Sequence, residues 1–394
     1  MLLDKIKNLG TQYFEEAVEI RHYLHQHPEH SFQEHKTTEF ILNYIKKIDN
    51  NIEIFTQFSK TGLVAKISGK NPSKRSVAIR ADIDALPIIE ETGTPYQSLN
   101  NGIMHACGHD LHTTSLLLAC KILSTLKNEI EGSFWCIFQP AEEKLPGGAK
   151  QMIDNGLLDF IKPDKIIGQH VMPNIEAGKV GIRSGNYMAS TDELYITVEG
   201  RGGHAALPHE INDTVLISSQ IIVALQQIVS RFIPAHIPSV LSFGKIIANG
   251  ATNIIPNKVN IEGTFRTMDE IWRAKAKEKI KTIAQGMAQS MGAKATINIV
   301  DGYPVLYNNP DLASHFKTIA QHFLGNDNVL DIDLRMTAED FAYYSHKVPS
   351  VFYRIGTGNT SKGITYPLHS SKFDIDESVL EYSSALLAYT ALNV

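Results

Sequence analysis

The sequence is poor in cysteine: its 394 residues include only three, which offer no framework of paired thiols. A chain of this kind does not depend on disulfides, which favours a reducing compartment. It also lacks a large excess of charge of either sign, because 37 basic and 42 acidic residues leave a net charge of -5. With no basic cluster, the sequence argues against nucleic acid or an anionic membrane as a partner.

Long hydrophobic runs are missing as well. We find no uninterrupted stretch of 18 apolar residues, and residues 1–27 are typical of an amphipathic helix with charges throughout rather than of a secretory leader. These absences predict a cytoplasmic protein that does not bind a membrane. The hydrophobic fraction of 43% is that of an ordinary globular protein, and the length predicts two domains.

Residues 105–112 concentrate three imidazoles, a thiol and a carboxylate in one short stretch. Cys107 and His109 are two residues apart, so on a helix they would point about 200° apart and could not bind one ion. We therefore expect them in a turn, followed by a helix over the apolar residues 113–127. A helix N-terminus favours a thiolate. The pattern predicts one wall of a metal site; the alternative is a loop with solvated histidines.

Apolar strands are expected at residues 77–80, 132–139 and 165–169, with helices between them, which predicts a mostly parallel α/β sheet. Asp82, the pair Glu142 and Glu143, and His170 each follow the end of one strand. His369 comes a short loop after a further strand at residues 351–355. Because ligands bind beyond the carboxyl ends of such strands, we expect these side chains to converge with the 105–112 turn.

From about residue 186 the pattern changes to β-α-β-β-α-β, the order of a ferredoxin-like unit. Long helices are expected at about residues 212–231 and 270–291, the first capped by Asn212 or Asp213 and the second by Asp269. The simplest account is one domain formed by residues 1–185 and 301–394, with residues 186–300 inserted as a second, α+β domain.

The expected donor set exceeds the four ligands that a single tetrahedral ion takes, and it suits two divalent ions. Mixed sulfur, nitrogen and oxygen donors favour zinc, manganese, cobalt or nickel over calcium or magnesium. The predicted ligands are Cys107, His109, Glu143, His170 and His369.

Adjacent Glu142 and Glu143 are expected to have different roles. If Glu143 binds metal, Glu142 can take a proton from the attacking water and pass it to a leaving amine, which is amide hydrolysis. The alternative for the pair is a surface loop. Asp82 is expected to orient a metal ligand, with a helix cap or a salt bridge as the alternative.

In the inserted domain, His204, Asn253 and Arg266 are candidates for substrate binding. An imidazole, an amide and a guanidinium can hold a developing oxyanion and a substrate carboxylate if the insert closes as a lid. Spacing does not decide whether they meet, and structural roles are the alternative.

Four stretches together resemble the cocatalytic metallopeptidase-like family of aminoacylases and zinc carboxypeptidases, in its N-acyl-amino-acid amidohydrolase branch with hippurate hydrolase. They are His-Ala-Cys-Gly-His-Asp at 105–110, Gln-Pro-Ala-Glu-Glu at 139–143, Gly-Gly-His-Ala-Ala at 202–206 and Pro-Leu-His-Ser at 367–370. The resemblance implies an α/β/α metallohydrolase domain with an inserted lid that also mediates dimers or tetramers. It implies that the predicted ligands hold two metals, that Glu142 is the general acid/base, and that N-acyl amino acids are the substrates. The family's first-strand His-x-Asp motif appears here as Arg80-Ala81-Asp82, without a histidine.

Three other functions compete with N-acyl-amino-acid hydrolysis. A dipeptidase or aminopeptidase would use the same site, but it needs an acidic group for a free α-amine, which the sequence does not locate. A metal-binding protein without catalytic activity would not need Glu142. A redox role for Cys107 lacks a resolving cysteine nearby in the sequence.

Overall fold

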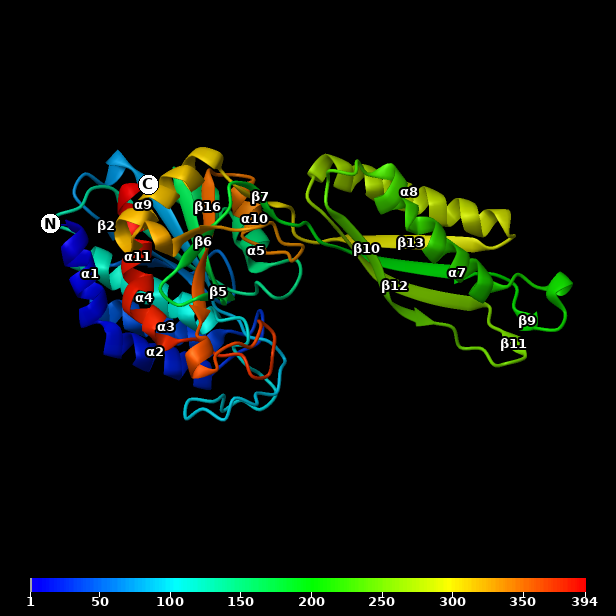
Figure 1. Cartoon of the computed structure of the whole chain (residues 1–394), viewed down its shortest axis with the longest axis horizontal. Coiled ribbons are helices and arrows are strands. Elements are labelled where there is room, and N and C mark those ends of the chain that lie inside the picture. Colours follow the sequence, from blue (N-terminus) through cyan, green and yellow to red (C-terminus); the bar gives the residue numbers. More distant parts are fainter. Residues whose placement is uncertain (1) are drawn as a thin grey trace. The chain divides into compact units, whose positions relative to one another are not determined.

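The computed structural model describes residues 2–394, which form two compact units. The first unit comprises residues 2–185, Tyr307–Asp333 and Asp340–Val394, and the second comprises Asn186–Leu306 and Leu334–Glu339. Each has a hydrophobic core of its own. Figure 1 shows the helices and strands that make up each unit.

The first unit is built on one eight-stranded sheet in which four of the seven strand pairs are parallel. The three central strands, β3, β5 and β16, run parallel to one another. In spatial order the strands are β1 (Glu53–Phe55), β2 (Leu63–Ser68), β4 (Ser133–Gln139), β3 (Ser76–Asp82), β5 (Lys165–Glu176), β16 (Ser350–Gly358), β6 (Val180–Ile182) and β15 (Val329–Asp331).

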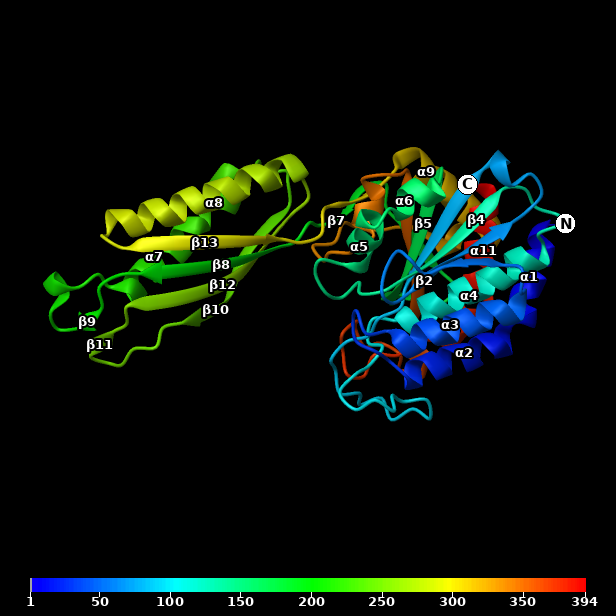
Figure 2. The same cartoon turned by 180° about the vertical axis from the view of Figure 1, so that it is seen from behind.

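Helices cover both faces of this sheet, as the fully buried strand β4 shows. Phe134 and Phe138 of β4 belong to the large core shared with the helices around α4, whereas Trp135, pointing the other way, contacts Phe160 of α6. The helices on the first face are α1 (Leu2–Gln12), α2 (Phe14–Gln26), α3 (His35–Ile48), α4 (His109–Thr125), α9 (Pro310–Leu324) and α11 (Leu380–Asn393). The shorter α5 (Gly148–Asp154) contacts both α6 (Leu157–Ile161) and α10 (Ala342–Ser345), and Figure 2 shows α5 and α6 apart from α1, α2 and α3.

The second unit is a four-stranded antiparallel sheet with two helices packed on one face. Leu194, Ile196 and Val198 of β8 are buried against the helices, while the residues between them are more exposed. In spatial order the strands are β10 (Ser239–Ile247), β12 (Lys258–Thr267), β8 (Asp192–Glu199) and β13 (Lys294–Asp301), and the helices are α7 (Thr214–Leu225) and α8 (Glu270–Ser290). This is the ferredoxin-like order.

The predicted fold class, a mostly parallel α/β domain with an inserted ferredoxin-like α+β domain, is confirmed. Two helices differ from the sequence-based expectation. The opening helix is divided at Tyr13 into α1 and α2, and α7 ends at Leu225, before a π-helical turn at Ile228–Phe232. As predicted, Asp213 caps α7: its side chain accepts hydrogen bonds from two amides of the first turn.

Candidate metal centre and active site

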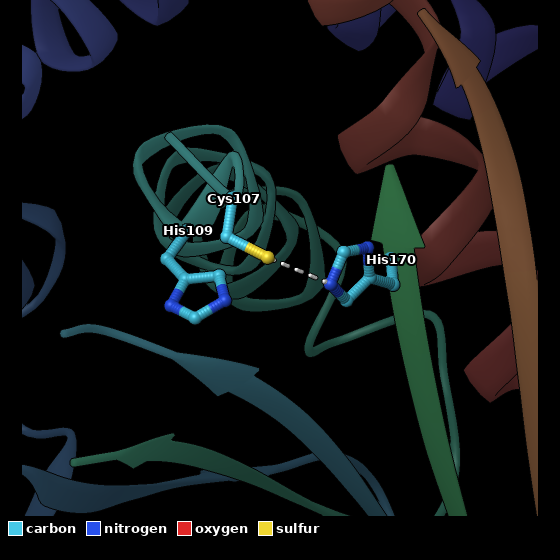
Figure 3. Close-up of side chains that lie close together, drawn as sticks. All are labelled: Cys107, His109 and His170. Carbon is cyan, nitrogen blue, oxygen red and sulfur yellow. Dashed lines mark hydrogen bonds between the residues drawn. The ribbon is translucent and has the colours of Figure 1, made fainter. Parts of the chain in front are cut away.

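The Cys107–His109 turn lies at the start of α4, where Gly108 is the N-cap with a φ of +79°. A side chain there would be strained, and its Cβ would lie 2.6 Å from Cγ2 of Val171. Gly108 therefore lets the turn press directly against β5. As a result, Cys107 Sγ lies 3.4 Å from His170 Nε2, and Figure 3 shows both side chains and His109 gathered at the end of the helix.

Two of the imidazoles are oriented through their Nδ1 atoms. His109 Nδ1 donates to Asp84, with the backbone oxygen at 2.9 Å and Oδ1 at 3.2 Å, and His170 Nδ1 donates to Val171 O at 2.8 Å. Both rings therefore present Nε2 to the cluster, as a metal-binding imidazole does when its other nitrogen is held.

Asp84, which the sequence analysis did not assign, connects three parts of the site. Its Oδ2 atom accepts hydrogen bonds from Ser31 Oγ at 2.6 Å and from the Glu143 amide at 3.0 Å, while Oδ1 faces His109. The carboxylate that holds Nδ1 of His109 is thus Asp84, whereas the sequence analysis named Asp82 for orienting a ligand.

Asp82 instead lies in a buried network behind the cluster. Its Oδ1 accepts from His112 Nδ1 at 2.6 Å, its Oδ2 accepts from Arg80 at 2.6 Å, and Oδ2 is 3.6 Å from His109 Nε2. His112 Nε2 accepts from the Val171 amide at 2.9 Å. His112 received no role from the sequence, although its position three residues after His109 puts both on one helix face, and that spacing was the available signal.

Glu143 and His369 complete the cluster from two other loops. Glu143 Oε1 is 3.3 Å from His369 Nε2 and 4.0 Å from His109 Nε2. The His369 amide donates to Ala106 O at 2.9 Å, which ties its loop to the Cys107 turn. Glu142 is buried, and its carboxylate lies within 4.8 Å of donor atoms of His109 and Glu143.

The side chains present fit divalent metal. Two triads of mutually close donor atoms share one thiol: Cys107 with His109 and His170, and Cys107 with Glu143 and His369. His109 Nε2 and Glu143 Oε1 are buried yet have no hydrogen-bond partner among the residues that the structure describes. Such orphaned atoms are costly unless something else binds them, and sulfur, nitrogen and oxygen donors together suit borderline cations.

The charges in the cluster agree with that fit. Burial, with the nearby Glu143 and Glu142, holds the pKa of the Cys107 thiol well above its ordinary value. Burial alone would lower the pKa of His109, but Asp82 and Asp84 raise it to about 10. The cluster thus concentrates negative charge that a bound cation would balance.

The three candidates in the second unit do not come together within one copy of it. His204 lies on β9 (Gly203–His204), which pairs with β11 (Ile254–Ile255), and Asn253 O accepts from Ala205 N at 3.0 Å. Arg266 lies near the other end of β12 and donates to Met336 O at 3.1 Å. Arg266 is eight residues along β12 from Lys258, the end that follows β11, which is roughly 26 Å in an extended strand.

A mostly parallel α/β sheet beside which thiol, imidazole and carboxylate donors come together is typical of a metal-dependent enzyme. Residues 78–393 match the model of peptidase family M20/M25/M40, and the chain belongs to this family.

Individual relatives match over nearly the whole chain. An N-acetyldiaminopimelate deacetylase of Bacillus cytotoxicus is 38% identical over 92% of this chain and 94% of its own length. Thermostable carboxypeptidase 2 of Saccharolobus solfataricus is 36% identical over 99% of this chain and 98% of its own. The solved structure of the Bacillus subtilis YXEP protein, described as a dinuclear metal-binding peptidase of family M20, is 33% identical with a TM-score of 0.83, covering 97% of this chain and 98% of that one.

These findings confirm the predicted family and the predicted class of activity, a metal-dependent amide hydrolase. Metal binding is supported by both the donor cluster and the dinuclear structural relative.

Proposed function

We propose that the protein hydrolyses the amide bond of N-acyl amino acids and releases the acid and the free amino acid. The observation that carries this proposal is the position of Glu142. It is a buried carboxylate that lies within 4.8 Å of donor atoms of His109 and Glu143 but belongs to neither of the triads that share Cys107. A site that only stored metal would not need such a group.

Two divalent ions, chosen from zinc, manganese, cobalt and nickel, would be held by the two triads that share Cys107. Bound there, they would acidify water and polarise the scissile carbonyl. Glu142 would accept the proton of the attacking water and deliver it to the leaving nitrogen, because its carboxylate lies next to the donor cluster. Asp84 would fix the position of the His109 ring relative to the main chain of Glu143, because its carboxylate hydrogen-bonds to both.

The deacetylase relative supports an N-acyl substrate, since its name describes removal of an N-acetyl group. The carboxypeptidase relative makes hydrolysis of peptides the second candidate. Both activities break an amide bond next to an amino acid, so Glu142 would act as the general acid/base in either. The two candidate activities differ in the group on the acyl side of that bond.

A panel assay separates the candidates. The protein is stripped with chelator, reloaded with zinc, manganese, cobalt or nickel, and offered N-acetyl, N-benzoyl, N-succinyl and indoleacetyl amino acids beside free and N-acylated dipeptides. We expect metal-dependent release of free amino acid from acylated single amino acids. Release from dipeptides alone would replace the proposal by a peptidase, and no release from any substrate would contradict both.

We also propose that the protein acts as a homodimer through its second unit. The support is twofold: α7 exposes Val215, Leu216 and Val223, and the β12 strand keeps His204 far from Arg266 within one copy. A substrate that touches both residues therefore needs the β9–β11 tip of a second copy.

Mixing two inactive variants tests this sharing. We expect His204→Ala and Glu142→Gln proteins to regain activity when mixed, because one mixed site then combines an intact Glu142 with an intact His204. Sedimentation would report the dimer itself. Dimers that exchange subunits without any recovery of activity would contradict sharing.

A cytoplasmic location is proposed as well, supported by the free, buried state of Cys107, Cys120 and Cys136. One helical stretch, Thr214–Phe232, is long and apolar enough to cross a membrane by length and composition. That is weak evidence for a span, because Ile217, Ile221 and Leu225 of this stretch belong to the core of the second unit. Cell fractionation that recovered the chain with membranes would contradict the proposed location.

A further inference from the structure

Residues 29–34, between α2 and α3, lie against the back of the metal-donor cluster. The backbone of this segment is joined to the loop after β3, because the Ala85 amide donates to Glu29 O at 2.9 Å and His30 bridges Ala85. From this segment Ser31 donates to Asp84, the carboxylate that holds His109 and the Glu143 amide. Glu34, the last residue of the segment, accepts a hydrogen bond from the amide of Ala141, the residue before the acidic pair.

Glu34 is fully buried, and its carboxylate accepts hydrogen bonds from three donors. The Phe32 amide at 2.9 Å and the Ala141 amide at 2.8 Å both bond to Oε1, and the Thr61 hydroxyl bonds to Oε2 at 2.6 Å. Burial and the nearby Asp84 raise the pKa of Glu34 to about 7. Keeping this carboxylate charged in its buried position therefore costs free energy of folding. A buried carboxyl group with three protein donors indicates a specific structural task.

The task is visible at Ala141, the residue directly before Glu142. Ala141 has a φ of +51°, which is unfavourable for a residue with a Cβ. The loop around it is also crowded: Gly148 N donates to Ala141 O at 2.9 Å, and a Cβ on Gly148 would lie only 1.8 Å from Pro140 O. A strained backbone persists only where its surroundings hold it.

We propose that Glu34 is a positioning residue that fixes the main chain of the Glu142–Glu143 pair from behind. The Glu34 carboxylate accepts a hydrogen bond from the amide of Ala141, and the Asp84 carboxylate accepts one from the amide of Glu143. The main chain is therefore fixed by a carboxylate on each side of Glu142. The side chains of the pair are thereby aimed into the donor cluster. The inference rests on the proposed function for the roles of Glu142 and Glu143, but its structural content concerns the loop itself.

The segment offers a matched control in Glu29. Its carboxylate also accepts hydrogen bonds from main-chain amides, those of Lys36 and Thr37, but these bonds hold the start of α3 and none of them reaches the 139–143 loop. Replacing Glu29 therefore disturbs the same part of the chain without releasing the acidic pair.

The test compares Glu34→Ala, Glu34→Gln and Glu29→Ala in the full-length protein. Zinc affinity is measured by competition with a chelating dye. The kinetic constants kcat and KM are measured on the best substrate of the panel, and the unfolding temperature is measured on the metal-free protein. We expect Glu34→Ala to lose about 10- to 100-fold in zinc affinity and in kcat, the range typical for groups that orient a metal ligand, with a smaller change in KM. In Glu34→Gln the amide oxygen can still accept from Ala141, so this variant should recover most of both.

Glu29→Ala is expected to lower the unfolding temperature while keeping zinc affinity and kcat. The proposal is overturned if Glu34→Ala binds zinc and turns over like the unmodified protein, or if Glu29→Ala loses as much of both as Glu34→Ala. Should Glu34→Ala fail to fold, Glu34→Gln decides the question. If its zinc affinity falls as far as that of Glu143→Gln, zinc binding depends on the charge of Glu34 and not on its hydrogen bond to Ala141, and the proposal is overturned. Zinc affinity is read without substrate, so failure of the proposed activity would not be mistaken for failure of this inference.

Discussion

Replacing Glu142 by glutamine is expected to lower kcat on the order of 10²- to 10⁴-fold, the usual contribution of a general acid/base. Glutamine keeps the size of the side chain but cannot take a proton from the attacking water or return one to the leaving nitrogen. Glu142 belongs to neither triad of donors that shares Cys107, so metal content should stay close to that of the unmodified protein. Rate and bound metal are measured on the same preparation.

Glu143→Gln is the matched control, because the same chemical change is made one residue away. Glu143 Oε1 is a buried oxygen without a hydrogen-bond partner among the described residues and lies 3.3 Å from His369 Nε2. Its loss should therefore lower metal content as well as rate. Unchanged turnover in Glu142→Gln would remove Glu142 from the mechanism, and loss of metal in both variants would make it another ligand.

The framework of the site was predictable because strand ends in a parallel sheet meet at one edge. Cys107 precedes α4 and His109 is the first residue of that helix. His170 was expected just after a strand, but it lies within β5, which continues to Glu176. Glu143 and His369 lie in loops that follow β4 and β16. The structure brings donor atoms of all five into two overlapping groups, through topology that the pattern of strands and helices already specified.

The contacts that orient these side chains could not be predicted in the same way. Asp82 and Asp84 are two residues apart, so in a continuous strand both would face the same side. The strand β3 ends at Asp82, and only the path of the chain after it decides that Asp84 bonds to His109 Nδ1 while Asp82 bonds to His112. Glu34 is more than a hundred residues from Ala141, and its partner is a main-chain amide that carries no sequence signature. Hydrogen bonds to backbone depend on loop conformation, which one sequence specifies poorly.

The second unit shows the same division between pattern and geometry. The alternation of apolar and polar residues and the candidate helix caps predicted its elements. The caps Asp213 and Asp269 form as expected. The grouping of His204 and Asn253 with Arg266 was a hypothesis about distance, and the length of β12 places Arg266 far from the other two within one copy. The hydrophobic periodicity of a sequence indicates where a strand lies. It does not indicate which residues near the two ends of that strand bind the same ligand.

Replacing Cys107 by serine is expected to weaken metal binding by more than the roughly 10- to 100-fold that loss of an orienting partner costs. Cys107 is common to both donor triads, so a neutral hydroxyl in place of a thiolate removes the strongest shared donor from each. Metal affinity is measured by competition with a chelator, and the metal that remains after dialysis is counted per chain.

Cys120→Ser controls for the change from sulfur to oxygen. Cys120 is fully buried in α4 beside Cys136, so its serine variant leaves a buried hydroxyl and should cost about 1–3 kcal/mol of the free energy of unfolding. It should nevertheless bind metal normally, because its thiol is in neither triad. If both serine variants lose metal equally, the loss reflects a weakened α4, and if neither does, Cys107 is not a ligand. Only a loss confined to Cys107→Ser shows that the thiolate joins the two halves of the centre.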